Sequence, residues 1–157
     1  MTKCLNCTAW LDESDRFCRF CGSFNATART TDDDLQKIWQ AAQRAYQRGD
    51  HANGVTLVKQ VISYAPNTLE AYYYLADCYT NLDQIDQAVA AMRQAQALQP
   101  GSSTVCFNLG VLEKRSGRLF EARQHVQDAL RLLETDALVT NRDELRVQMQ
   151  KTLVELS

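Results

Sequence analysis

The sequence predicts an all-α chain in which pairs of helices repeat and stack as a solenoid, preceded by a small metal-binding module. Three observations support this. Six glycines and two prolines in 157 residues leave few breaks for helices. The segment that ends at Pro66 is similar to the one that ends at Pro100, so the chain repeats with an offset of 34 residues. Four cysteines lie within the first 21 residues, spaced C-x2-C-x10-C-x2-C.

The N-terminal cysteines have the spacing of a closed tetrahedral zinc site: Cys4, Cys7, Cys18 and Cys21. Two C-x-x-C pairs can place four thiolates around one ion, and zinc is the usual occupant of such a site. Four thiolates leave no position for water or substrate, so we expect one structural Zn²⁺ and no catalytic metal. A pair of redox C-x-x-C motifs is the alternative, but no βαβ pattern surrounds the cysteines.

The residues around these cysteines give the N-terminal module a family resemblance. With Phe17 before the second pair and Gly22 after it, residues 1–24 resemble the short zinc ribbon of bacterial proteins, although Thr8 stands where the first pair usually has glycine. The resemblance implies a module that docks proteins and, in some cases, nucleic acid. Residues 25–34 form a polar linker whose final aspartates favour the positive end of a helix beginning near Leu35.

The repeated part divides into three windows, 35–68, 69–102 and 103–134. Small residues at matched positions, such as Ala76 in the second window and Gly110 in the third, predict a close approach between the two helices of each pair. Turn residues follow each first helix: Gly49, Asp83 and Gly117. Pro66 and Pro100 then stop the second helices.

The last segment, 135–157, predicts one more helix that covers the open end of the array. Within it, helix 141–156 would start at a capping box formed by Asn141 and Glu144. Its predicted apolar stripe consists of Leu145, Met149, Thr152, Leu153 and Leu156. A terminal repeat otherwise exposes its apolar face to water, so we expect this helix to cap the solenoid.

The 34-residue pattern resembles the tetratricopeptide repeat, a pair of antiparallel helices per unit. The shared positions of the second window are Leu75, Ala76, Tyr79, Ala88, Met92, Ala95 and Pro100. Three residues depart from the pattern: Gly54 lies inside a second helix, Glu113 replaces the usual aromatic residue, and Glu134 replaces the proline.

The resemblance implies a concave groove lined by the first helix of each repeat. The residues expected to bind a partner there are Trp39, Gln40, Gln43, Tyr46, Tyr73, Tyr74, Asp77, Asn81, Phe107, Asn108, Val111 and Lys114. Aromatic side chains of this kind are enriched in interaction hot spots, and the amides can bind a peptide backbone. Packing of some aromatics against neighbouring repeats is the alternative. The basic clamp by which some family members hold a C-terminal carboxylate is absent, because Trp39, Gln43, Tyr74, Thr104 and Asn108 occupy its positions.

Composition and the remaining reactive residues argue against nucleic-acid binding, membrane insertion and catalysis. The net charge is −2, so no basic face for nucleic acid is expected, and no apolar run could span a bilayer. Cys78 and Cys106 fall inside predicted first helices and are expected to be buried, while His51 and His125 are expected at the surface or in packing. No nucleophile, base and oxyanion set can be assembled.

These observations predict a non-catalytic cytoplasmic adaptor that holds a protein partner in the groove, with the zinc ribbon as a structural or second docking module. Two other functions remain open. One is a regulatory or assembly subunit of an enzyme complex; the other is a nucleic-acid-associated factor that acts through the ribbon. No membrane partner and no small-molecule substrate are expected.

Overall fold

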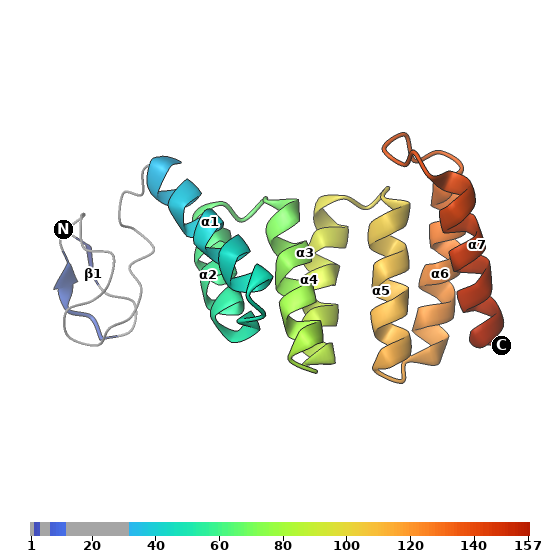
Figure 1. Cartoon of the computed structure of the whole chain (residues 1–157), viewed down its shortest axis with the longest axis horizontal. Helices are drawn as coiled ribbons and strands as arrows, with labels where there is room; N and C mark the ends of the chain where they lie inside the picture. The colour runs from blue at the N-terminus through green and yellow to red at the C-terminus, as the bar shows by residue number, and fades with distance from the viewer. Residues whose placement is uncertain (1, 4–6, 12–31) are drawn as a thin grey trace.

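The computed structural model describes residues 2–3, 7–11 and 32–157. Residues 32–157 form a row of helices (Figure 1). Their bounds are α1 Asp32–Gln47, α2 His51–Tyr64, α3 Leu69–Asn81, α4 Ile85–Leu98, α5 Ser103–Arg115, α6 Leu119–Leu133 and α7 Arg142–Glu155. None of these helices is both long and apolar enough to cross a membrane.

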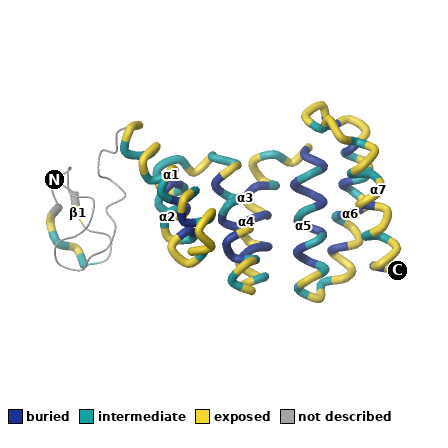
Figure 2. The backbone as a smooth tube through the Cα atoms, in the orientation of Figure 1, coloured by how far each residue is buried: buried dark blue, intermediate teal, exposed yellow. Residues whose placement is uncertain are grey.

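Consecutive helices pack against each other along the whole row, which confirms the predicted helical solenoid. Buried residues recur in every helix of the row (Figure 2). One core cluster extends from Ala42 in α1 to Leu112 in α5, and a second joins α5, α6 and α7 around Leu133 and Met149. Each helix therefore buries its apolar side against neighbours close in sequence, as expected of a repeat array.

The reversals after the first helices have the left-handed backbone that their residues predict. Gly49 and Gly117 have φ values of +74° and +81°, and Asp83 has a φ of +58°. Glycine adopts this region without a Cβ penalty, and Asp tolerates it better than most residues. The second helices α2 and α4 end at Tyr64 and Leu98, two residues before Pro66 and Pro100.

Close helix contact explains two glycines inside helices. A Cβ added to Gly110 would lie 2.8 Å from Cγ2 of Val126 and 3.1 Å from the carbonyl oxygen of Ala122. A Cβ added to Gly54 would lie 2.9 Å from Sγ of Cys78. The predicted role of Gly110 is confirmed, and Gly54, which departs from the repeat pattern, is needed because α2 meets α3 at that point.

The C-terminal helix α7 covers α6 as predicted. Met149 is fully buried and Leu156 is 6% exposed, and both join the second core cluster with Leu145 and Leu153. The predicted capping box is wrong, because the Asn141 side chain makes no capping hydrogen bond. Helix α6 ends at Leu133 although no proline follows it.

The loop between α6 and α7 carries a buried aspartate that sequence reasoning missed. Asp136 is 7% exposed, and its Oδ2 accepts hydrogen bonds from both the backbone N–H and the hydroxyl of Ser103, each at 2.8 Å. Its Oδ1 accepts from the N–H of Leu138 at 3.1 Å. Asp136, 33 positions along the chain from Ser103, thus pairs the backbone N–H of Ser103 at the start of α5. The first N–H groups of a helix have no partner within the helix itself.

Asp136 should make stability depend on pH. Burial raises the pKa of the Asp136 carboxyl. The hydrogen bonds from Ser103 and Leu138 and the nearby Arg142 guanidinium lower it by more than burial raises it, so the pKa lies below its ordinary value. This stabilisation is present above the unfolded-state pKa of about 3.9 and is lost as pH falls through the lower folded-state pKa. We expect Asp136→Asn to lose about 1.5–3 kcal/mol at pH 7, and less below pH 4.

Urea unfolding of both proteins, followed by circular dichroism from pH 7 to pH 3, measures this difference. Asp143→Asn is the control, because the Asp143 side chain is 97% exposed and should change stability by less than about 0.5 kcal/mol. A gap between wild type and Asp136→Asn that stays constant down to pH 3 would contradict the assignment.

The N-terminal part contains a pair of short strands in addition to the helices. Strands β1, Thr2–Lys3, and β2, Trp10–Leu11, pair in antiparallel register, with Lys3 opposite Trp10. The Lys3 ammonium lies 4.9 Å from the centre of the Trp10 ring. Of the four predicted zinc ligands, Cys4, Cys18 and Cys21 lie outside the described residues, as does most of the predicted ribbon and linker. Cys7 lies in the turn that leads to β2.

Candidate protein-binding site

Three aromatic side chains from two first helices form a cluster at the N-terminal end of the array. Trp39 and Tyr74 meet edge to face with ring centres 5.0 Å apart, and Tyr46 meets Tyr74 in the same way at 5.2 Å. All three are partly buried. Edge-to-face pairs contribute about 0.5–1.5 kcal/mol beyond their buried area. The cluster therefore joins α1 to α3 and leaves part of each ring exposed, so the predicted inter-repeat packing and the predicted surface coexist here.

Beside this cluster, Asp77 on α3 accepts a hydrogen bond from the Tyr46 hydroxyl at 3.4 Å. The Asp77 carboxylate raises the pKa of Tyr46, and burial adds to the effect. Partial burial also raises the pKa of Asp77, although the Tyr46 bond and His51 oppose this shift. The Tyr46 hydroxyl and the Asp77 carboxylate therefore link α1 to α3 beside the aromatic cluster.

A cleft of about 260 Å³ separates α3 from α5. Ala76, Met92 and Leu112, each less than 9% exposed, belong to its lining and give it an apolar base. The remaining lining residues are Tyr73, Asp77, Thr80, Asn108, Val111 and Arg115. Arg115 forms no ion pair within residues 32–157, so the cleft combines an apolar base with polar and charged side chains that could bind a ligand. We call this the α3–α5 cleft.

The predicted partner-binding residues do not all reach this surface. Tyr73, Asp77, Asn108 and Val111 line the α3–α5 cleft, and Trp39, Tyr46 and Tyr74 form the neighbouring cluster. Gln40 is exposed and Gln43 partly exposed on α1, and the exposed Asn81 bonds the Asp77 carbonyl at 2.8 Å.

Two predicted groove residues are committed to other contacts. Phe107 is only 8% exposed and packs in the second core cluster, because α5 turns this ring toward α6 and α7. Its prediction as an accessible groove residue is therefore wrong, and the alternative in which this aromatic packs against neighbouring repeats holds for Phe107. Lys114 forms an ion pair with Glu155 of α7.

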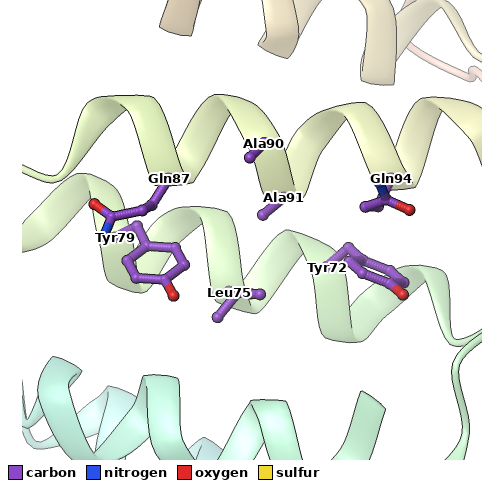
Figure 3. A pocket seen from close by; sticks show the side chains of 7 residues that line it. All are labelled: Tyr72, Leu75, Tyr79, Gln87, Ala90, Ala91 and Gln94. Carbon is purple, nitrogen blue, oxygen red and sulfur yellow. The ribbon is translucent and has the colours of Figure 1, made fainter. Parts of the chain in front are cut away.

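Two further hollows lie away from the α3–α5 cleft. One, of about 330 Å³, is lined by Leu35, Gln36 and Trp39 of α1 together with Val61, Thr68 and Glu70. The other, of about 250 Å³, lies between α3 and α4 on a different face of α3, where Tyr72, Leu75 and Tyr79 face Gln87, Ala90, Ala91 and Gln94 (Figure 3). The second hollow provides a reference surface for testing which face binds a partner.

The two helical cysteines are buried, as predicted. Burial raises the pKa of the Cys78 thiol to about 11, with a further contribution from Asp77. Burial likewise raises the pKa of the Cys106 thiol to about 11, helped by Asp128 and Glu113. Thiols with such pKa values are poor nucleophiles at neutral pH.

Sequence reasoning missed the role of Glu113. Its side chain is fully buried and contacts Arg93 on α4 and His125 on α6. His125, expected at the surface or in packing, is thus the hydrogen-bonded partner of a buried carboxylate. The available signal was the 34-residue offset, which aligns Glu113 with Tyr79 and Arg93 with Lys59.

These features define a helical-repeat protein whose first helices present a cleft and an aromatic cluster. Two family models, both described as tetratricopeptide repeat, match residues 45–105 and 81–137. Residues 45–137, more than half of the chain, are therefore tetratricopeptide repeats.

Solved structures share this fold. The type III secretion chaperone SycD of Yersinia enterocolitica, in complex with a peptide of the translocator YopD, is 17% identical, with a TM-score of 0.70 over 80% of this chain and 94% of that chain. PcrH from Pseudomonas aeruginosa is 15% identical, with a TM-score of 0.70 over 82% of this chain and 95% of that chain. PcrH in complex with the chaperone binding region of PopD is 14% identical, with a TM-score of 0.70 over 81% and 93%.

Proposed function

We propose that this protein is a non-catalytic adaptor that binds a segment of a partner protein on the face formed by α1, α3 and α5. The observation that carries the proposal is the α3–α5 cleft, with its apolar base and its Asn108 and Arg115 side chains, next to the cluster of Trp39, Tyr46 and Tyr74. An apolar side chain of the partner would fill the cleft, and Asn108 could bond its backbone. Interfaces of this kind concentrate their binding energy in a few buried anchors.

The solved structures of the same fold support this proposal. Two of them are complexes with a peptide of YopD or with the chaperone binding region of PopD. We infer that a comparable peptide segment is the ligand here. An extended or helical segment of a larger protein could present such an anchor, and binding would require no chemistry from the chain.

A pair of arginine substitutions tests which face binds. Val111→Arg places a charged side chain in the α3–α5 cleft, whereas Ala90→Arg does so in the hollow between α3 and α4. A random-peptide display selection on the wild-type protein supplies the probe. We expect Val111→Arg to weaken the selected peptide at least about tenfold by fluorescence anisotropy, which corresponds to about 1.4 kcal/mol.

Ala90→Arg should bind the same peptide as tightly as wild type. Circular dichroism should show that both variants remain helical. The proposal is wrong if Ala90→Arg loses the peptide while Val111→Arg retains it, or if neither substitution changes the affinity.

We further propose that residues 1–24 form a zinc ribbon, joined by residues 25–34 to the repeats, in which Cys4, Cys7, Cys18 and Cys21 hold one structural ion. Two features of the described residues fit this assignment. Strands β1 and β2 flank the first C-x-x-C pair, and Thr8 has a φ of +59°, a conformation that favours the glycine usual at this position. Bound zinc would supply folding energy to a segment too small to bury a core.

Metal analysis tests the ribbon. We expect about one zinc per chain in the purified protein, and about none after Cys18→Ser and Cys21→Ser are combined. Thermal unfolding of the helices should be nearly unchanged in that variant, because the ribbon is proposed as a separate module. Full zinc content in the double variant would contradict the ligand set.

A further inference from the structure

The joints between successive repeats differ in chemistry. Between the first and second repeats, the Lys59 ammonium of α2 lies 5.6 Å from the centre of the Tyr79 ring of α3. The 34-residue offset places Arg93 and Glu113 at the same positions of the next joint. There an ion pair replaces the contact between a cation and a ring.

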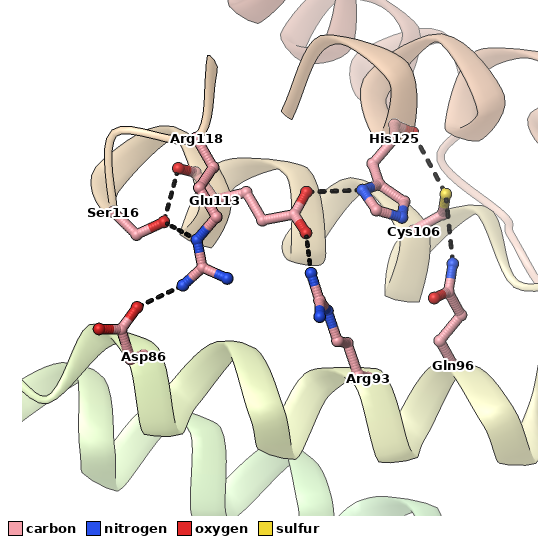
Figure 4. Close-up of polar contacts among 8 residues, drawn as sticks. All are labelled: Asp86, Arg93, Gln96, Cys106, Glu113, Ser116, Arg118 and His125. Atoms are coloured by element: carbon pink, nitrogen blue, oxygen red, sulfur yellow. Dashed lines mark hydrogen bonds and ion pairs between the residues drawn. The ribbon is translucent and has the colours of Figure 1, made fainter. Parts of the chain in front are cut away.

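Glu113 is the centre of this second joint (Figure 4). Its Oε1 accepts a hydrogen bond from Nη2 of Arg93 at 3.1 Å, and its Oε2 lies 2.6 Å from Nδ1 of His125. The carboxylate side chain is 0% exposed, whereas Arg93 is 51% and His125 23% exposed. One buried acceptor thus holds α4 and α6 to α5 by short, directional contacts.

Surrounding polar contacts extend the joint along the same three helices. The Glu113 carbonyl accepts from the Ser116 hydroxyl and from the N–H of Arg118, each at 2.9 Å. The Arg118 guanidinium pairs with Asp86 of α4. At the other end, Sγ of Cys106 donates to the His125 carbonyl at 3.2 Å. These contacts add further links between α4, α5 and α6 on either side of the Glu113 carboxylate.

The same helix that carries Glu113 forms one wall of the α3–α5 cleft. Asn108, Val111 and Arg115 line the cleft, and residues two positions apart on a helix point in directions about 200° apart. Glu113 therefore acts on the side of α5 opposite the cleft. A displacement of α5 at the joint would move the cleft wall as a rigid element.

We propose that Glu113 is a positioning residue that sets the spacing between α3 and α5, and so the width of the cleft in which a partner would bind. The assignment of a binding role to this spacing rests on the proposed function; the geometric claim does not. The buried Glu113 carboxylate, held by hydrogen bonds to two partners, permits one arrangement of α4, α5 and α6. The contact of Lys59 with the Tyr79 ring is less directional, so it allows α2 to slide along α3. The first joint lacks this constraint.

Three equivalent exposed positions allow the geometry to be measured. Gln47, Asn81 and Arg115 each occupy the same place in successive repeats. Spin labels attached through a genetically encoded keto amino acid leave the six native cysteines unlabelled. Double electron–electron resonance between positions 81 and 115 reports the second joint, and between positions 47 and 81 the first.

We expect Glu113→Gln, which keeps the side-chain volume but removes the charge, to shift or at least double the width of the 81–115 distance distribution and to leave 47–81 unchanged. Lys59→Ala, the matched control at the first joint, should leave both distributions unchanged. An unaltered 81–115 distribution in folded Glu113→Gln, or an equal change in both pairs, would overturn the proposal. Failure of Val111→Arg to affect peptide binding would instead count against the proposed function alone.

Discussion

Replacing both partners of Glu113, in the variant Arg93→Ala/His125→Ala, should destabilise the protein by about 3–5 kcal/mol. The carboxylate is fully buried, and these two side chains are its hydrogen-bonding and ion-pair partners. A carboxylate removed from water without compensating contacts is among the largest single penalties in a folded protein. Because typical domains unfold with only about 5–15 kcal/mol, the loss would be a large part of the total. Urea unfolding monitored by circular dichroism measures it.

A third substitution separates the buried charge from the lost packing. Adding Glu113→Leu to the double variant removes the uncompensated carboxylate and fills its place with an apolar side chain. Replacement of a buried ion pair by apolar residues is often neutral or stabilising by about 1–4 kcal/mol, so the triple variant should recover most of the loss. A triple variant that is no more stable than the double would show that the charge is not the source of the effect.

Gly110→Val should produce the second large effect. Even a Cβ at this position would lie 2.8 Å from Val126 and 3.1 Å from the Ala122 carbonyl oxygen. Overpacking of a well-packed contact costs about 1–3 kcal/mol for small additions, and the two further methyl groups of valine place this variant at or above the upper end. Adding Val126→Ala should relieve it only partly, since the Ala122 contact is to backbone. The midpoint of urea unfolding measures each variant.

Two other glycines provide controls for that experiment. Gly101→Ala should change stability by less than about 0.5 kcal/mol, because an added Cβ meets nothing within 4 Å. Gly54→Ala should destabilise, because its Cβ would lie 2.9 Å from Sγ of Cys78, and Cys78→Ala should largely restore stability in the double variant. Equal effects of Gly110→Val and Gly101→Ala would contradict the close approach of α5 and α6.

Much of the fold could be predicted because repeats bury their apolar faces against neighbours near in sequence. The positions of Gly49, Asp83, Gly117, Pro66 and Pro100 mark turns and helix ends through backbone preferences that act locally. The stripe of α7 was readable for the same reason, since Met149 and Leu156 follow helical spacing. The Asn141 capping box failed because a capping motif in the sequence does not by itself establish the hydrogen bond.

The candidate site was only partly readable. The resemblance to the tetratricopeptide repeat placed Tyr73, Asp77, Asn108 and Val111 on one face, and the structure gathers them around one cleft. The sequence could not show that Phe107 is turned into the core, because that depends on how closely α6 and α7 approach α5. Nor could it show that Lys114 is paired with Glu155, which lies 41 residues away.

The sequence by itself determined the helical repeat and its turns, because both depend on periodicity and on the backbone preferences of single residues. Its resemblance to the tetratricopeptide repeat indicated which helices form the candidate binding face. The tertiary structure alone decided that Glu113 joins α4, α5 and α6, that Asp136 completes the start of α5, and that the α3–α5 cleft exists. The Glu113 and Asp136 contacts require side chains separated by up to 33 residues to meet within hydrogen-bonding distance, and the cleft requires α3 and α5 to lie side by side. Such meetings are set by the packing angles of whole helices, which no local pattern of residues specifies.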